Sequence, residues 1–166
     1  MPEKEYSFGE TYSPFGSKSM MFTTEAGKAM ERAVSDWLKT GRDVSKWGGF
    51  KGELKKGIEV VDRCGSASRT YAEQEALFLE KGPGYAKKPG TSLHETGTAV
   101  DIQGSLTYFR NWLAEFGQKY GWSQRKYGGR KDPETGQMTG QVEHHFEYSK
   151  PKEDVAMDAM KEKPLF

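Results

Sequence analysis

Apolar residues recur at helical spacing in two stretches of the chain. The first stretch predicts a helix that begins at Thr23 or Thr24 and ends at Gly41. In the second stretch, residues 109–120, the repeat of large apolar and aromatic side chains predicts packing in the core rather than a surface that binds a ligand. The apolar face of the first helix consists of Ala26, Met30, Ala33, Val34, Trp37 and Leu38, and that of the second of Phe109, Trp112, Leu113, Phe116 and Tyr120.

A third helix is indicated by its end signals. Thr70 and Glu73 form a capping box, in which the hydroxyl accepts from a backbone amide and the glutamate reaches back. The helix continues to about Lys81, and the sequence Gly82-Pro-Gly stops it. Arg69 is therefore expected at the junction between a strand and this helix, where its side chain can point into a cleft. A surface salt bridge is the alternative for Arg69.

Three segments read as strands. The β-branched content of residues 57–62 favours a strand there. Residues 98–102 form a short apolar run that ends around Asp101, and residues 141–148 give a third strand. We therefore expect an α+β fold, in which a small antiparallel sheet is flanked by helices.

The remaining segments are expected to be irregular or short. Residues 41–57 predict a connecting loop, and residues 124–140 a long loop, which is either a lid, a substrate-binding edge or a disordered stretch. The predicted organisation is one domain over residues 1–166, with an N-terminal arm at 1–22, a motif-bearing core at 57–148 and a C-terminal helix or tail at 151–166.

Composition narrows the possible partners. The net charge is +1 with both signs spread along the chain, which does not favour a nucleic-acid partner. No apolar run approaches the roughly 20 residues of a membrane helix, and the first residues do not form a signal peptide. We expect a monomer made in the cytoplasm. The single cysteine, Cys64, excludes an internal disulfide and is expected to be a small core residue rather than a reactive thiol.

The candidate chemistry lies with the histidines. His94 and Asp101 stand seven positions apart, with Gly97 between them to allow a sharp turn. Imidazole and carboxylate both bind zinc, and a catalytic zinc site needs three protein ligands and an open position. The only other histidines, His144 and His145, are adjacent, so one of them would complete the set. A surface loop with a chance histidine is the alternative for the first segment taken alone.

These segments resemble a known family. The pattern S-x-H-x-x-G-x-A-x-D at residues 92–101, followed by H-F-E-Y at 145–148, is similar to zinc peptidases that cut peptidoglycan stem peptides. They include D-alanyl-D-alanine carboxypeptidases and phage L-alanyl-D-glutamate endopeptidases, and they share a core fold with lysostaphin and hedgehog domains. The similarity extends to residues 65–74 and to the Pro-Gly-Thr-Ser sequence at 89–92, and it covers about residues 57–148.

The resemblance implies a zinc-dependent peptidase with peptidoglycan stem peptides as substrates. It selects His145 as the third ligand, beside His94 and Asp101, because the family's histidine directly precedes the aromatic-acid pair. Strand alternation agrees, since it would place Glu143 and Glu147 on the same face as His145. His144 would point away.

The chain departs from the family pattern at one position. Many relatives carry the catalytic acid three residues before the metal histidine, where this chain has Val142. We therefore assign Glu143 as general base, although a bulge could shift the register. Zinc would make hydroxide available from bound water, and Glu143 would move the proton. Arg69 would hold the substrate or the oxyanion, and Ser92 would hydrogen-bond the peptide backbone.

Two other readings stay open. Val142 supports a peptidoglycan-binding or virion structural protein that keeps the metal site without the chemistry. A zinc hydrolase of some other amide is the second. As an enzyme without an export signal, the protein would reach the wall through phage lysis or as part of a virion.

Overall fold

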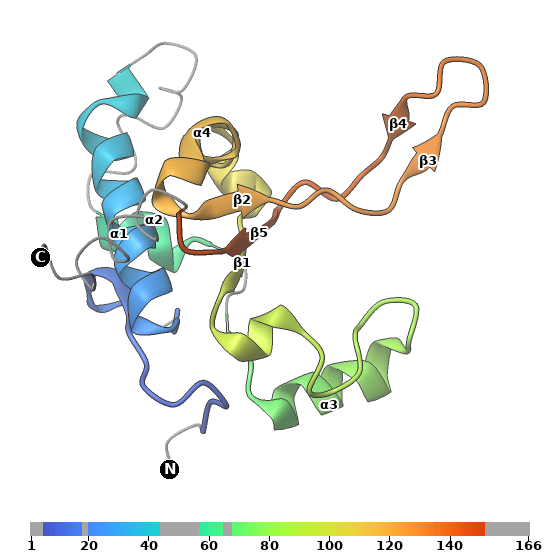
Figure 1. Cartoon of the computed structure of the whole chain (residues 1–166), viewed down its shortest axis with the longest axis horizontal. Helices are drawn as coiled ribbons and strands as arrows, with labels where there is room; N and C mark the ends of the chain where they lie inside the picture. The colour runs from blue at the N-terminus through green and yellow to red at the C-terminus, as the bar shows by residue number, and fades with distance from the viewer. Residues whose placement is uncertain (1–4, 18–19, 44–56, 65–67, 152–166) are drawn as a thin grey trace, which may run out of the picture.

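The computed structural model describes residues 5–17, 20–43, 57–64 and 68–151, and it confirms an α+β fold with a small antiparallel sheet flanked by helices (Figure 1). The expected loop around Trp47 and the C-terminal helix beyond Pro151 lie outside these residues. The α-helices are α1 (Thr24–Lys39), α2 (Gly57–Asp62), α3 (Tyr71–Lys81) and α4 (Thr107–Phe116). The strands are β1 (Ala99–Asp101), β2 (Trp122–Gln124), β3 (Arg130–Lys131), β4 (Met138–Thr139) and β5 (His145–Tyr148).

The main sheet has three antiparallel strands in the order β1-β5-β2. The central strand β5 is the last of the three in sequence, and it pairs with β1 so that Asp101 lies opposite His145. On its other edge, Glu147 of β5 lies opposite Ser123 of β2. The sheet therefore brings residues that are distant in sequence to one place.

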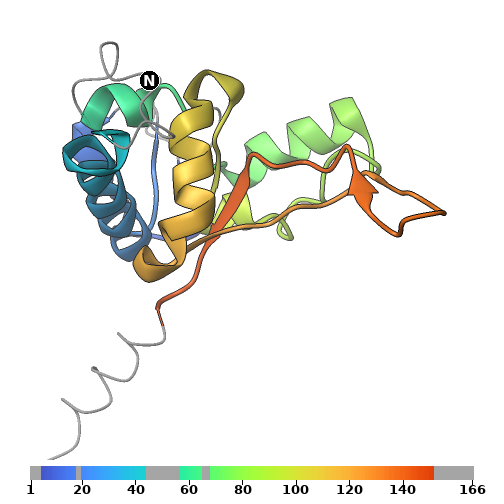
Figure 2. The same cartoon turned by 90° about the horizontal axis from the view of Figure 1, so that it is seen from above.

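The helices that form the core lie on one side of this sheet. Helices α1, α2 and α4 pack there, while α3 and the β3–β4 hairpin project on the other side (Figures 1 and 2). Thr23 caps α1 as predicted, because its side chain accepts from the backbone N–H of Ala26 at 3.2 Å. The largest fully buried aromatic side chains in this core are Trp37, Trp122, Phe22, Phe109 and Phe146. Each contributes roughly 1.5–3 kcal/mol by leaving water, which holds the sheet firmly against the helices.

Residues 57–62 form helix α2, so the prediction of a strand was wrong. A strand would turn Val60 and Val61 to opposite faces, yet both are buried on one side of the helix. Together with Gly57 and Cys64 they follow the i, i+3, i+4, i+7 spacing of a helix. Gly57 and Cys64 are weakly apolar, so the three β-branched residues Ile58, Val60 and Val61 dominated the sequence pattern. Arg69 consequently follows a helix rather than a strand.

Residues 125–144, here called the hairpin extension, leave the sheet and return to it. The structure gives this segment a two-stranded hairpin in place of the long irregular loop expected from its sequence. An isolated bridge between Tyr127 and Val142 joins its two arms near the sheet. Within the part of the chain that the structure describes, no helix has the length and apolar character needed to cross a membrane.

Candidate metal centre and surrounding cavity

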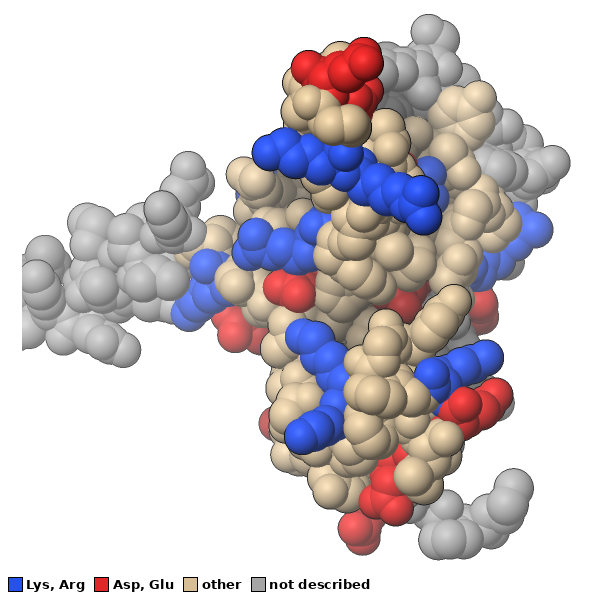
Figure 3. Space-filling view, turned by 90° about the vertical axis from the view of Figure 1, so that its right-hand side faces the viewer, with Lys and Arg blue, Asp and Glu red and all other residues tan. Residues whose placement is uncertain are grey.

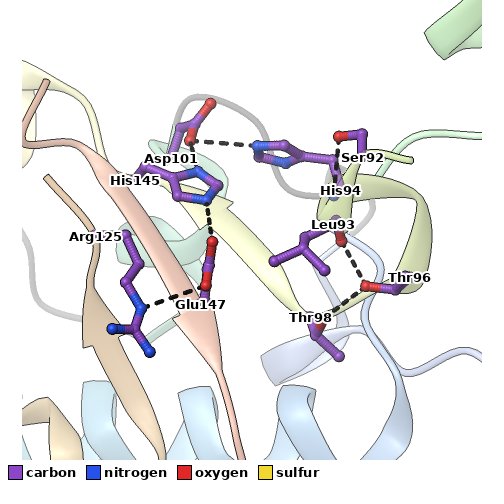
Figure 4. A network of polar contacts seen from close by, with 9 residues as sticks. All are labelled: Ser92, Leu93, His94, Thr96, Thr98, Asp101, Arg125, His145 and Glu147. Atoms are coloured by element: carbon purple, nitrogen blue, oxygen red, sulfur yellow. Dashed lines mark hydrogen bonds and ion pairs between the residues drawn. The ribbon is translucent and has the colours of Figure 1, made fainter. Parts of the chain in front are cut away.

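Three elements bring the predicted metal ligands together. His94 lies in a single 3-10 turn (Leu93–Thr96), Asp101 ends β1, and His145 begins β5. Asp101 and His145 are cross-strand partners, which explains how residues so distant in sequence meet. Figure 4 shows the three side chains pointing toward one another.

The turn that carries His94 is held by a buried carboxylate. Glu95 accepts from the backbone N–H groups of Gly90 at 2.9 Å and Ser92 at 3.0 Å, and the Ser92 hydroxyl caps the turn from the other side. This second capping box was missed in the sequence, although Ser92 and Glu95 have the same spacing as Thr70 and Glu73, whose predicted box is confirmed.

Gly97 ends this turn in the left-handed region, with φ of 71°. A Cβ placed at this glycine would lie 2.8 Å from the ring of Phe8 and from the backbone nitrogen of Thr23. The Ser7 hydroxyl also donates to the carbonyl of Glu95 at 2.8 Å. The N-terminal segment thus packs directly against the loop between the two predicted ligands His94 and Asp101.

The spacing of the ligand atoms fits a tetrahedral zinc site. Asp101 Oδ1 lies 3.1 Å from His145 Nδ1 and 3.5 Å from His94 Nε2. Two ligands about 2.1 Å from zinc at a tetrahedral angle are roughly 3.4 Å apart. All three atoms lie within 4.8 Å of one another, and two imidazoles with one carboxylate form a donor set that zinc favours.

Electrostatics in this cluster favour a charged Asp101. Burial raises the pKa of its carboxyl, but hydrogen bonds with His145 and His94 outweigh burial and place the pKa well below its usual range. The pKa of His145 is raised, first by its hydrogen bond with Asp101 and further by Glu147, against the opposing effect of burial. A deprotonated carboxylate at the centre of the cluster is the form that binds a cation.

The far side of the His145 ring also has a fixed partner. Its Nε2 lies 3.1 Å from Glu147 Oε1, and Glu147 Oε2 lies 3.4 Å from Nε of Arg125 (Figure 4). A ligating histidine commonly donates its other ring N–H to a carboxylate, which fixes the tautomer and the ring orientation. Glu147 is placed to do this when Nδ1 of His145 faces the metal position.

The cluster forms part of the wall of a cavity of about 450 Å³. Both α3 with its following loop and the start of the hairpin extension contribute to the cavity. Its lining consists of Arg69, Gln74, Leu77, Tyr85, Ala86, Lys87, Ser92, Leu93, His94, Asp101, Arg125, Tyr127, His145 and Glu147.

Arg69 and Ser92 line this cavity beside the metal ligands. The guanidinium of Arg69 donates to Gln74 Oε1 at 3.1 Å, and its backbone N–H donates to the carbonyl of His94 at 2.9 Å. Ser92 Oγ accepts from the backbone N–H of His94 at 3.3 Å. Both residues are therefore tied to the His94 segment and face the same space.

Glu143 and His144 do not line the cavity in this conformation. Glu143 Oε1 lies 3.7 Å from Lys126 Nζ, and its side chain is half exposed. The carbonyl of His144 accepts from the N–H of Ile102 at 2.8 Å, next to the predicted ligand Asp101. Strand β5 begins only at His145, so the alternation predicted over residues 141–148 does not extend back to Glu143.

Several lining residues were not found from the sequence. Lys87 and Tyr85 lie in the loop after α3, and Arg125 and Tyr127 begin the hairpin extension. The ring of Tyr127 meets that of His145 edge to face, with centroids 6.0 Å apart. Their only signal was the abundance of Gly, Pro and charge around them, which marks a loop without saying what it faces.

Comparisons with protein-family models and with characterised proteins found no match to this chain. Comparison with solved structures found similar folds at low sequence identity. A structure of the LdcB LD-carboxypeptidase, described as revealing peptidoglycan recognition, gives a TM-score of 0.49 at 22% identity, covering 83% of this chain and 70% of that chain.

Two further solved structures are similar to a comparable degree. VanYB in complex with D-alanine-D-alanine gives a TM-score of 0.48 at 18% identity, over 92% of this chain and 83% of that one. A variant of the vancomycin-resistance D,D-pentapeptidase VanY, in complex with Zn(II), gives a TM-score of 0.46 at 18% identity, over 86% of this chain and 80% of that one.

Proposed function

We propose that this chain is a zinc-dependent peptidase that hydrolyses an amide bond in peptidoglycan stem peptides. The observation that carries the proposal is the convergence of His94 Nε2, Asp101 Oδ1 and His145 Nδ1 in the wall of one cavity. The sequence motifs that supply these three residues resemble stem-peptide hydrolases, which gives the substrate class. D,D-carboxypeptidase and endopeptidase activities, at the D-alanyl-D-alanine or the L-alanyl-D-glutamate bond, belong to this class.

His94, Asp101 and His145 would hold the zinc, which would act as a Lewis acid and lower the pKa of water toward neutrality. The carboxylate of Asp101 offsets part of the metal charge, and the two imidazoles keep the site selective for zinc over calcium or magnesium. Because Asp101 and His145 are fixed by strand pairing, the site requires little rearrangement on binding the ion.

Arg69 and Ser92 are proposed to bind the peptide next to the reacting carbonyl. Arg69 offers a planar set of N–H donors suited to a carboxylate or an oxyanion, and Gln74 holds its orientation. The Ser92 hydroxyl accepts from His94 and can still donate its own hydrogen to a backbone carbonyl.

Glu143 is our proposal for the general base. It lies two residues before His145. Its Oε1 forms an exposed ion pair with Nζ of Lys126, at 3.7 Å. Such a surface pair contributes little free energy, so a rotation of the Glu143 side chain toward the site costs little. Glu147 is the competing candidate, because it already lines the cavity, but it is engaged by His145 and Arg125.

The outward position of Glu143 favours a second candidate function. With Val142 at the position where relatives carry an acid, the chain could bind stem peptides at a metal site without hydrolysing them. It would then serve as a wall-binding or virion protein, with the same ligands and the same cavity.

The deciding experiment measures amine release from purified peptidoglycan, together with a zymogram containing embedded cell walls. The proposal expects hydrolysis by the zinc-loaded protein, loss with a chelator, and recovery on adding zinc. His94→Ala is the matched negative control. Binding to cell walls without any amine release from the zinc-loaded protein would establish the binding function instead.

A further inference from the structure

The cavity is bounded by two walls of similar chemistry. The loop after α3 contributes Tyr85 and Lys87, and the start of the hairpin extension contributes Arg125 and Tyr127. Each wall thus brings one tyrosine and one cation, with the metal ligands between them. A peptide lying across the metal residues would contact both walls.

The charge of the lining is unbalanced toward positive. Three cationic side chains line the cavity, Arg69, Lys87 and Arg125, against the two carboxylates of Asp101 and Glu147. Both carboxylates are engaged within the site, Asp101 by the histidines and Glu147 by His145 and Arg125. A zinc ion would add two further positive charges. The chain as a whole is close to neutral, at +1, so this excess is local.

More cations lie on the same two sides outside the lining. Lys126, Arg130 and Lys131 are exposed on the hairpin extension, and Lys81 and Lys88 are exposed beside the α3 loop. Figure 3 shows Lys and Arg on both the upper and the lower half of this face, with Asp and Glu at the outer ends and also between the two halves. Exposed carboxylates accompany these outer cations, such as Glu80 beside Lys81 and Glu143 beside Lys126, so the positive excess belongs to the lining itself. A cavity lined mainly by one sign of charge raises the local concentration of ligands of the opposite sign.

The two tyrosines add a surface for the peptide itself. Tyr85 is 88% exposed and Tyr127 is 53% exposed, although both border the cavity. Exposed aromatic side chains at the edge of a cavity are typical of ligand contacts, since they provide a large contact area with a polar tip. Their placement on opposite walls matches an extended ligand rather than a compact one.

Arg125 retains donors for such a ligand. Its Nε faces Glu147, so the terminal guanidinium nitrogens remain for an incoming carboxylate, while Glu147 sets the plane of the group. Lys87, on the other wall, offers an ammonium that accepts a carboxylate from many directions. The two cations are therefore suited to two separate carboxylates.

We propose that the cleft selects a peptide with two carboxylates, one bound by Lys87 and the other by Arg125, on either side of the scissile amide. This inference rests on the proposed function. In a stem peptide, these groups are the α-carboxylate of D-glutamate and the C-terminal carboxylate of D-alanine. The bond that is cut then lies between them.

The test uses four synthetic pentapeptides of the form L-Ala-γ-D-Glu-L-Lys-D-Ala-D-Ala. Either carboxylate, both or neither is converted to the amide, and binding to the zinc-loaded protein is measured by calorimetry. Each amidation is expected to weaken binding roughly 5- to 10-fold at low salt. The difference should shrink at high ionic strength, because exposed charges are screened.

The variants assign the two contacts. In Lys87→Gln, amidation of one carboxylate is expected to leave the binding affinity unchanged. In Arg125→Gln, the same is expected for amidation of the other carboxylate. Lys88→Gln and Arg130→Gln are the matched controls, since these cations are exposed nearby but do not line the cavity. Circular dichroism and zinc content establish that Arg125→Gln keeps its fold and metal.

Two outcomes would overturn the inference. One is full discrimination between acid and amide in both Lys87→Gln and Arg125→Gln. The other is an equal loss in the two control variants, or equal competition by poly(glycerol phosphate), which would indicate a general polyanion surface. Mass spectrometry of the recovered peptides separates this result from the function. Discrimination without cleavage would keep the two carboxylate contacts and remove the peptidase. Cleavage without discrimination would keep the peptidase and remove the two contacts.

Discussion

The two sides of the cavity differ in how their functional side chains are held. His94 and Asp101 are 6% and 9% exposed, and strand pairing and a capping box fix their backbones. Across from them, Arg125, Lys126 and Tyr127 are exposed on a hairpin extension that leaves the packed core (Figure 2). The buried side suits a metal, which needs ligand atoms at defined distances. The exposed side suits a substrate, which can be accommodated by side chains that adjust.

The largest effect is expected on zinc affinity, when a predicted metal ligand on the buried side of the cavity is removed. His94→Ala and His145→Ala should each lower zinc affinity by more than the roughly 10- to 100-fold that removal of an outer partner costs. His144→Ala should retain zinc, because its side chain does not line the cavity. Metal content after gel filtration and competition with a chromophoric chelator measure both. Zinc loss in His144→Ala with retention in His145→Ala would show that the wrong histidine was assigned.

The next effect concerns turnover alone and is expected at Glu143, on the hairpin extension outside the cavity lining. Glu143→Gln should keep the fold and the zinc but lower turnover by about 10²–10⁴-fold, since the amide cannot accept the proton. The readout is amine release from peptidoglycan, with zinc content measured in parallel. Glu147→Gln is the control, because its amide oxygen can still accept from His145. Normal turnover in Glu143→Gln with a collapse in Glu147→Gln would move the base to Glu147.

Removal of the Glu147 side chain sharpens the contrast further. Glu147→Ala should weaken zinc binding by about 10- to 100-fold, since His145 loses the acceptor that orients its ring. Glu147→Gln should restore most of this affinity. Chelator competition gives both values without reference to activity. Equal zinc affinity for wild type and Glu147→Ala would show that strand pairing alone orients His145.

The smallest effect is expected for a change that keeps charge. Arg69→Lys should lower kcat/KM by roughly tenfold, because an ammonium lacks the planar pair of donors that Gln74 orients. Zinc affinity should stay unchanged, since Arg69 is not a ligand. Wild-type kinetics for Arg69→Lys, on the same peptide substrate, would leave Arg69 with a surface role.

The buried side was largely predictable from the sequence, and the exposed side was not. His94, Gly97 and Asp101 stand close together in the chain, so local turn and strand signals place them, and the structure brings all three predicted ligands together. The position of Glu143 depends on where β5 begins, which the pairing with β1 decides rather than any local pattern. The same limit applies to residues 57–62, where helix packing outweighed β-branched content.

The residues of the hairpin extension and the α3 loop were missed for a related reason. Arg125, Tyr127 and Lys87 carry no periodicity, and their partners across the cavity are far away in sequence. A charged loop residue reads the same whether it faces solvent or a ligand. Distances between segments, which a single sequence does not contain, make that distinction.

The strand order β1-β5-β2 has a consequence for how the protein is made. The central strand is the last of the three to leave the ribosome, and Asp101 meets His145 across 44 positions. Until residues 145–148 leave the ribosome, β1 and β2 lack the strand that pairs with both of them. His94 and Asp101 then lack His145, the third predicted ligand. A nascent chain therefore lacks the complete set of predicted ligands. Because long-range pairing folds slowly, the proposed activity should appear only after synthesis has passed β5. For a protein proposed to degrade cell walls, this strand order means that incompletely synthesised chains are inactive.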